Sequence, residues 1–183
     1  MLPFTKSPSK NRSITIHYEE IKAIETDKDV IITEESQRRA ACQRIVVENV
    51  FWSASVGLVP VPLVDVIGIT AIQLKMVNEI SIEYGVRFSR NRAKALITAL
   101  SSGMGMFAVS SLKLIPGVGS ASSGIGMSVM GGALTYAVGT LFIEHFETGG
   151  TLEDLDVQRA RKRMEALAKE GQSVAAEQQK RAT

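Results

Sequence analysis

The sequence predicts an all-α protein made of two proline-hinged helical hairpins, at least the second inserted in a membrane, followed by a C-terminal amphipathic helix. Three observations support this fold class. Between Ala95 and Ile143 only Lys113 is charged, although charged residues make up 22% of the chain. The prolines of VPVP and LIPG interrupt two apolar regions at points where a helix cannot continue. A Thr-x-x-Asp pattern at Thr151 then opens an amphipathic stretch rich in arginine.

Four regions are expected along the 183 residues. In order they are a polar arm, a helical membrane-associated domain, an amphipathic helix and a disordered tail: 1–33, 34–150, 151–170 and 171–183. Within the arm, SITIHY alternates weakly and suggests a short edge strand. Thr33 is placed to cap the first helix, which is expected to start at Glu34 and end near Gly57.

Three more helices follow from the apolar pattern. One begins near Pro62 and ends before Gly85, which fits proline at a helix start and glycine just past its end. Beyond a basic connector, VRFSRNRAK, the others cover 95–112 and 119–146, and the latter ends at ETGG. The predicted hinges are Pro60, Pro62, Pro116 and Gly117.

The helices over 95–112 and 119–146 approach the ~20 apolar residues that a membrane-spanning helix needs. Small residues recur every four positions and predict a helix-packing and oligomer interface: Ser120, Gly124, Ser128 and Gly132. Basic residues flank the hairpin and are expected at the membrane surface: Arg87, Arg90, Arg92, Arg159, Arg161, Lys162 and Arg163. This distribution predicts that both termini lie in the cytoplasm. The alternative is a soluble bundle whose apolar helices are buried all round.

The segment KLIPGVGSASSGIG, residues 113–126, superficially resembles a phosphate-binding loop. It lacks the Lys-Ser/Thr pair of a P-loop and the third glycine of a dinucleotide fingerprint, so we interpret it as a hairpin bend. A net charge of +2 is too small to favour nucleic acid as a partner. The single cysteine, Cys42, and two distant histidines predict no metal site, and we expect no cofactor and no catalytic residue.

Asp65 is the one acidic residue in the apolar start of the second helix. Its place in the first turn favours a role at the positive end of the helix dipole. An ion pair with a neighbouring helix, or a place in the wall of a pore, are the alternatives, because ionisable groups inside membranes are usually functional.

Three stretches together resemble a known family: PVPLVDVIGITAIQLKMVNEISIEYGV, LIPGVGS and GGALTYAVGTLFIEHFETGGTLED. They are similar to the YcjF-type family of bacterial domains of unknown function, the DUF-six-nine-seven family, over roughly Val46 to Val157. The resemblance implies association with the bacterial inner membrane and a link to Era-like GTPase domains, next to which such domains often lie. Residues 1–45 are too few to hold a GTPase, so the resemblance implies a separate GTPase partner. It supplies no catalytic residues.

These observations lead to the expectation of a non-enzymatic membrane scaffold or adaptor that forms homo-oligomers, contacts membrane lipids and works with a separate GTPase. One alternative is an oligomeric pore or small-solute channel that uses Asp65 and the serines of the helix over 119–146. The other is a soluble helical protein that binds a lipid.

Overall fold

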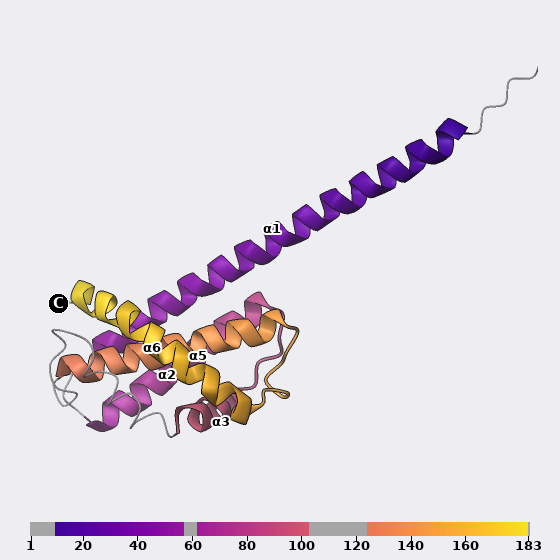
Figure 1. Ribbon diagram of the computed structural model, residues 1–183. Coiled ribbons are helices and arrows are strands. Elements are labelled where there is room, and N and C mark those ends of the chain that lie inside the picture. The colour runs from indigo at the N-terminus through magenta and orange to yellow at the C-terminus, as the bar shows by residue number, and fades with distance from the viewer. Residues whose placement is uncertain (1–9, 57–61, 103–123, 183) are drawn as a thin grey trace, which may run out of the picture. The chain divides into compact units, whose positions relative to one another are not determined.

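The structure, a computed structural model, describes residues 10–56, 62–102 and 124–182, and its regular secondary structure there is entirely helical (Figure 1). The described residues form five helices: α1 (Lys10–Val56), α2 (Pro62–Glu83), α3 (Arg90–Ser101), α5 (Gly124–Glu147) and α6 (Val157–Ala182). The chain divides into two compact units, Met1–Arg38 and Arg39–Thr183. The all-α prediction is confirmed.

The first unit contains the amino-terminal part of α1. The expected loop and edge strand were wrong here, because the helix begins at Lys10 and continues through Thr33 without a break. Residues 10–33 include no proline or glycine, so a helix that starts at Lys10 meets no breaker. The side chains of Val30, Ile31 and Ile32 are about half exposed on this unit.

The second unit is a helical bundle, to which α1 contributes its carboxyl-terminal part. Four side chains spaced four residues apart are buried there and form one face of α1: Cys42, Val46, Val50 and Ala54. This spacing places them in a row along the helix, so α1 packs on the core through a narrow apolar stripe.

Glycines end α2 and α5 by the same mechanism. Gly85 has a φ of 65°, and the amides of Gly85 and Val86 donate to the carbonyls of Ile82 and Ser81 at 3.1 and 2.8 Å. This pattern is a Schellman motif, in which a left-handed residue lets two late carbonyls find donors. Gly149, with a φ of 80°, ends α5 in the same way. The predicted ends at Gly85 and at ETGG are confirmed.

The start of α3 differs from the prediction. The helix begins at Arg90, five residues before the expected Ala95, and the described part of the chain stops at Ser102. The segment Arg90–Lys94 had been assigned to a connector because it is basic. Arginine, alanine and lysine are strong helix formers, and the Ala93 amide donates to Ser89 O at 2.8 Å, so the helix extends back to Arg90.

Helix α5 runs through the middle of the bundle. Its buried side chains occur on every face of the helix: Val129, Ala133, Ala137, Val138, Leu141, Phe142, Ile143 and Phe146. A helix that is apolar all round must be surrounded by other apolar groups, and here the chain's own helices surround it. This burial accounts for the absence of charge between Gly124 and Ile143, for which insertion of the helix into lipid was the expected cause.

Helix α6 was only partly predicted. Thr151 N does donate to Asp154 Oδ1 at 2.7 Å, as expected of the Thr-x-x-Asp pair, but this contact closes a turn before the helix. The helix starts at Val157, where Asp156 Oδ1 accepts from the amides of Gln158 and Arg159 at 2.9 and 3.2 Å. The disordered tail over 171–183 was wrong, because α6 continues to Ala182 and buries Ala175 completely.

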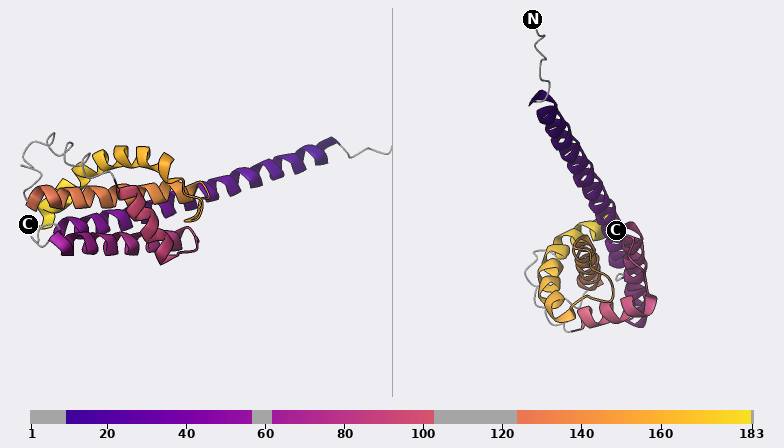
Figure 2. Two further views of the ribbon diagram at one scale, coloured as in Figure 1. Left: turned by 90° about the horizontal axis from the view of Figure 1, so that it is seen from below. Right: turned by 90° about the vertical axis from the view of Figure 1, so that its right-hand side faces the viewer.

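Contacts between helices fix their directions in the bundle. Helices α2 and α5 are parallel, since Ile69 meets Gly131 and Met76 meets Gly139. Helix α6 is antiparallel to α5, as the pairs Glu144–Arg163 and Tyr136–Glu170 show. In the end-on view of Figure 2, α5 lies between α6 on one side and α2 on the other.

The bundle therefore has two distinct ends. At the first, α1 and α6 end while α2 and α5 begin; we call this the linker end. At the second, α2 and α5 end while α3 and α6 begin; polar contacts gather there, and we call it the network end.

Candidate functional site

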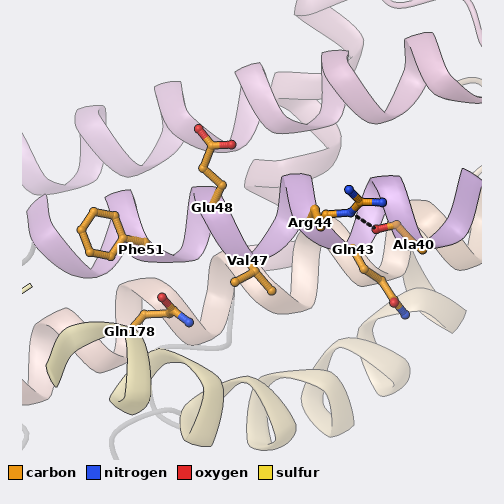
Figure 3. A pocket seen from close by; sticks show the side chains of 7 residues that line it. All are labelled: Ala40, Gln43, Arg44, Val47, Glu48, Phe51 and Gln178. Carbon is orange, nitrogen blue, oxygen red and sulfur yellow. Dashed lines mark hydrogen bonds between the residues drawn. The ribbon is translucent and has the colours of Figure 1, made fainter. Parts of the chain in front are cut away.

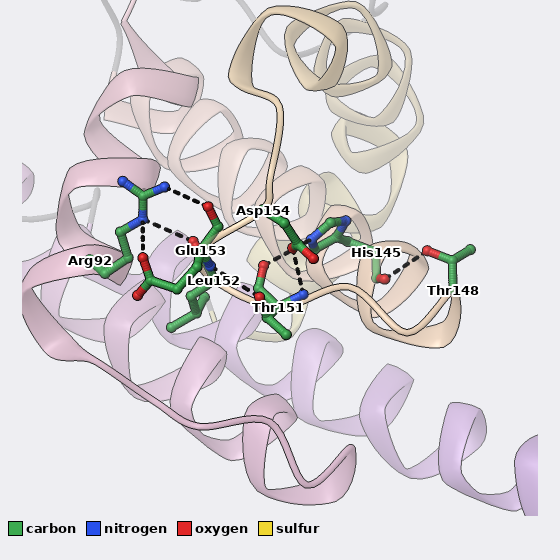
Figure 4. A network of polar contacts seen from close by, with 7 residues as sticks. All are labelled: Arg92, His145, Thr148, Thr151, Leu152, Glu153 and Asp154. Carbon is green, nitrogen blue, oxygen red and sulfur yellow. Dashed lines mark hydrogen bonds and ion pairs between the residues drawn. The ribbon is translucent and has the colours of Figure 1, made fainter.

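Arg92 holds the connection between α5 and α6 at the network end (Figure 4). Its Nε donates to Leu152 O at 2.9 Å and its Nη2 to Glu153 O at 3.0 Å, while the Glu153 carboxylate lies 3.5 Å from Nε. Because Arg92 lies in the first turn of α3, these contacts tie α3 to the loop that precedes α6. The guanidinium is engaged within the chain.

His145 and Asp154 form the other half of this network (Figure 4). His145 Nε2 lies 3.0 Å from Asp154 Oδ1 and 2.9 Å from Thr151 O. The Thr151 amide, and after it the His145 ring, hold the pKa of the Asp154 carboxyl below its usual range. A Cβ at Gly150 would collide with the His145 ring, so the loop backbone lies directly against that ring. The arrangement positions a loop, and both side chains also line a pocket of about 320 Å³ between α5 and α6 that Glu144, Arg159 and Arg163 border.

Two arginines of α6 also bind within the chain. Arg161 Nη2 donates to Ala99 O at 2.9 Å and to Ser102 Oγ at 3.1 Å, where α3 ends. Arg163 Nε donates to Glu144 at 2.9 Å and its Nη2 to the other carboxylate oxygen, a bidentate pair that lowers the pKa of Glu144. Three of the seven residues predicted at the membrane surface, counting Arg92, are therefore interhelical clamps.

The other four of these basic residues are exposed: Arg87, Arg90, Arg159 and Lys162. None of them forms an ion pair within the part of the chain that the structure describes. Their assignment to a membrane surface stays a prediction.

Glu147 completes the network end near the close of α5. It pairs with Arg39 of α1 and accepts a hydrogen bond from Tyr84 Oη at 3.2 Å. Partial burial, followed by the charge of Glu147, raises the pKa of the Tyr84 phenol. One acidic side chain thus joins α1, at Arg39, to the ends of α2 and α5.

The predicted small-residue ridge is used inside the chain where the structure describes it. Ser128 Oγ donates to Ala54 O of α1, and both residues are fully buried. A Cβ on Gly132 would lie 2.7 Å from Ala175 Cβ of α6, so glycine permits this helix contact. Ser120 lies outside the described residues, and Gly124 is the first residue of α5. A contact between copies through this ridge stays a prediction.

Most of the predicted hinges lie outside the residues that the structure describes. Pro62 is the first residue of α2, as expected, whereas Pro60, Pro116 and Gly117 lie outside the described residues. Asp65 is in the first turn of α2, the place where a carboxylate suits the helix dipole. Its side chain is outside the described part, and its role stays a prediction.

A series of buried hydrogen bonds crosses the bundle, and it was not predicted. Gln73 Nε2 donates to Thr135 Oγ1 at 3.3 Å, and Thr135 Oγ1 donates to Ser53 Oγ at 2.8 Å. These side chains come from α2, α5 and α1 and are at most 3% exposed. Since buried polar groups need partners, these hydrogen bonds restrict how the three helices can slide past one another. The sequence signal was weak: Ser53 lies on the same helical face as Cys42, Val46 and Val50.

A groove on the surface of α1 has a volume of about 620 Å³ (Figure 3). Val47 and Phe51 supply its apolar floor, Arg44 and Glu48 stand beside them, and Gln178 of α6 closes one side. No cluster of three metal-ligating side chains occurs among the described residues. Likewise, within the ranges that the structure describes, no helix is both long and apolar enough to cross a bilayer.

The fold and the site define a class: an all-helical bundle whose polar residues link helices to one another. Comparison with known families identifies the family to which the chain belongs. Residues 30–172 match the domain of unknown function DUF697, and the chain belongs to this family. It is 34% identical over 145 residues to magnetosome membrane protein 22 of Magnetospirillum gryphiswaldense, with 76% of this chain and 74% of that protein covered. No solved structure matches it. The family resemblance inferred from the sequence is confirmed.

Proposed function

We propose that this protein is a non-enzymatic, membrane-associated scaffold whose bundle faces the bilayer with its linker end. The observation that supports this most directly is the exposure of large apolar side chains near the linker end. In the sequence, the segments that follow α1 and α3, 57–61 and 103–123, contain one charged residue, Lys113. Charged side chains occur at both ends of the bundle: Arg92, Arg163 and Arg39 pair with acidic partners at the network end, and the last turn of α6 brings Lys180 and Arg181 to the linker end.

Two large apolar side chains near the linker end are exposed to solvent. Trp52, near the end of α1, is 52% exposed, and Ile67, near the start of α2, is 70% exposed. Tryptophan favours the membrane–water interface, and transfer of an isoleucine side chain out of water contributes about 1.5–3 kcal/mol. A relative named as a membrane protein supports the same assignment.

Ile67 and Ile82 offer a matched test of this orientation. Both are isoleucines of α2 with nearly equal exposure, 70% and 68%, and the helix separates them by about 22 Å. In a Cys42→Ala background, Ile67→Cys and Ile82→Cys are each labelled with a polarity-sensitive fluorophore. On addition of vesicles we expect a blue shift and protection from an aqueous quencher at position 67 only.

Equal responses at positions 67 and 82 would exclude the proposed orientation. Recovery of the wild-type protein entirely in the soluble fraction of its host, without detergent, would exclude membrane association itself. The labelled variants are compared by circular dichroism first, so that unfolding is not taken for a change of environment.

Homo-oligomerisation and recruitment of a separate GTPase are the remaining parts of the proposal, and the second rests on the family resemblance. Light scattering of the detergent-extracted protein tests the first: a monomeric mass at membrane-like concentration would exclude it. Co-purification of a nucleotide-hydrolysing partner with the full chain tests the second.

A further inference from the structure

A second groove lies between α2 and α3 and combines an apolar floor with free cations. It consists of two adjoining pockets of about 350 and 300 Å³ that share Ala71, Leu74 and Arg90. The first pocket continues to Ile67 and Thr98, and the second to Lys75 and Phe88.

The groove changes character along its length. Ile67 lines the first pocket and Lys75 the second, with Ala71 and Leu74 in both, so the groove follows α2 from Lys75 to Ile67 for ~12 Å. Its Arg90 end is cationic, and its Ile67 end is apolar and directed toward the linker end.

Two cations of the groove are not used by the fold. Arg90 and Lys94 lie one turn apart on α3, both exposed, and neither forms an ion pair within the described ranges. The first turn of α3 contains no acidic residue that would neutralise them. Lys75, by contrast, pairs with Glu79 at 2.9 Å. This separates Arg90 and Lys94 from Arg92, Arg161 and Arg163, whose guanidinium groups hold helices together.

We propose that the α2–α3 groove binds one anionic phospholipid, whose phosphate contacts Arg90 and Lys94 while its acyl chains follow Ala71 and Leu74 toward Ile67. The proposal rests on the proposed membrane association and assigns it a lipid class. Charge complementarity selects an anionic headgroup, and the apolar floor selects a ligand with attached hydrocarbon. The direction of the groove matches a bilayer at the linker end.

The charge requirement is tested by flotation with vesicles of phosphatidylcholine, with or without phosphatidylglycerol. The Arg90→Gln/Lys94→Gln variant is compared with Arg87→Gln/Arg159→Gln, which removes the same charge from exposed residues outside the groove. We expect the groove variant to lose about tenfold in partitioning to anionic vesicles, and the control less than about threefold. Equal losses would show unspecific surface attraction and overturn the proposal.

The shape requirement is tested with monomeric short-chain lipids. Ala71→Trp fills the groove without a change of charge, and Ala95→Trp is the matched control on the exposed surface of α3. Titration calorimetry is expected to show that short-chain phosphatidylglycerol binds to wild type and Ala95→Trp but at least tenfold more weakly to Ala71→Trp. Equal binding of short-chain phosphatidylcholine, or binding of a glutamate-rich peptide in place of the lipid, would overturn it.

These outcomes separate the groove from the proposed function. If the groove variant still binds neutral vesicles but has lost its preference for anionic ones, both proposals are supported. If wild type binds no vesicles yet binds short-chain phosphatidylglycerol, the groove stands and the membrane scaffold fails. If both variant pairs bind every lipid as wild type does, the groove proposal fails alone.

Discussion

Arg161 lies where the carboxyl-terminal end of α3 meets α6, and it donates to the carbonyl of Ala99 from two nitrogens at 3.2 and 2.9 Å, beside Ser102 Oγ, which donates to the same oxygen at 2.8 Å. Late carbonyls of a helix have no donor within the helix, and a cation at this end also suits the dipole. Arg161 thus acts as an interhelical cap for α3.

The Arg161→Ala variant is expected to lower the free energy of unfolding by about 1–2 kcal/mol, because it removes both charged donors to Ala99 O and leaves only the Ser102 hydroxyl. Arg161→Lys is expected to be intermediate, since a lysine cannot donate from a planar fork. Urea unfolding followed by circular dichroism measures both. Lys162→Ala, an exposed neighbour, is the control, and an equal loss there would contradict the capping role.

Glu144 gives the protein a defined response to acid. The hydrogen bonds from Arg163 lower its pKa below the ordinary value of 4.5, so the pair stabilises the fold above that pH. The contribution is lost as the pH falls through the lowered pKa. The free energy of unfolding of wild type is expected to exceed that of Glu144→Gln by at most about 1 kcal/mol near pH 7, with the gap closing as the pH falls below 4.5. A gap that stays constant over this range in urea titrations would contradict the assignment.

Individual roles were the least predictable feature of the sequence. The seven basic residues were grouped correctly as a class that flanks the uncharged region, but Arg161 and Arg163 point to partners 62 and 19 residues away. No local pattern identifies such partners, because they depend on which helix ends meet. The Thr151–Asp154 contact was predictable since both groups lie within one turn of the chain.

At the scale of elements, α6 shows why the predicted tail was wrong. QSVAAEQQKRA is polar and resembles a disordered terminus, yet its alanines, glutamines and charged residues are good helix formers without a breaker. Ala175 packs against Gly132 of α5, and Gly171 brings α6 close to the Ala133 carbonyl. Small residues at these positions let α6 approach α5 closely, a signal that the hydrophobic pattern alone does not contain.

Removal of residues 171–183 is therefore expected to destabilise the bundle by more than about 2 kcal/mol, because it uncovers buried side chains of α5. The denaturant slope should also fall, since less surface is buried in the folded state. A matched truncation that removes only 182–183 is expected to behave as wild type. If the longer truncation were equally harmless, the packing of this part of α6 on α5 would be refuted.

At the scale of the whole molecule, one sequence signal has two physical causes. A helix without charges is either embedded in lipid or surrounded by protein, and both demand apolar residues on every face. The sequence predicted the helical class, the ends of α2 and α5 and the family. It could not show that α1, α2 and α6 enclose α5, because long-range packing leaves no mark in a local run of residues.

Because α5 is enclosed by other helices, we can predict how the bundle behaves when the protein is bound to a membrane. If the bundle stays intact there, α5 and α6 remain coupled through the pair formed by Glu144 and Arg163. Glu144→Arg and Arg163→Glu are each expected to lower the melting temperature of the vesicle-bound protein, and the double reversal to restore most of the loss. The fluorescence of Trp52, the single tryptophan, reports the transition. Glu144→Arg with Arg87→Glu, an exposed residue outside the pocket that Glu144 lines, is the control that should give no rescue. Failure of the true double reversal would mean that α5 leaves α6 when the protein binds a membrane.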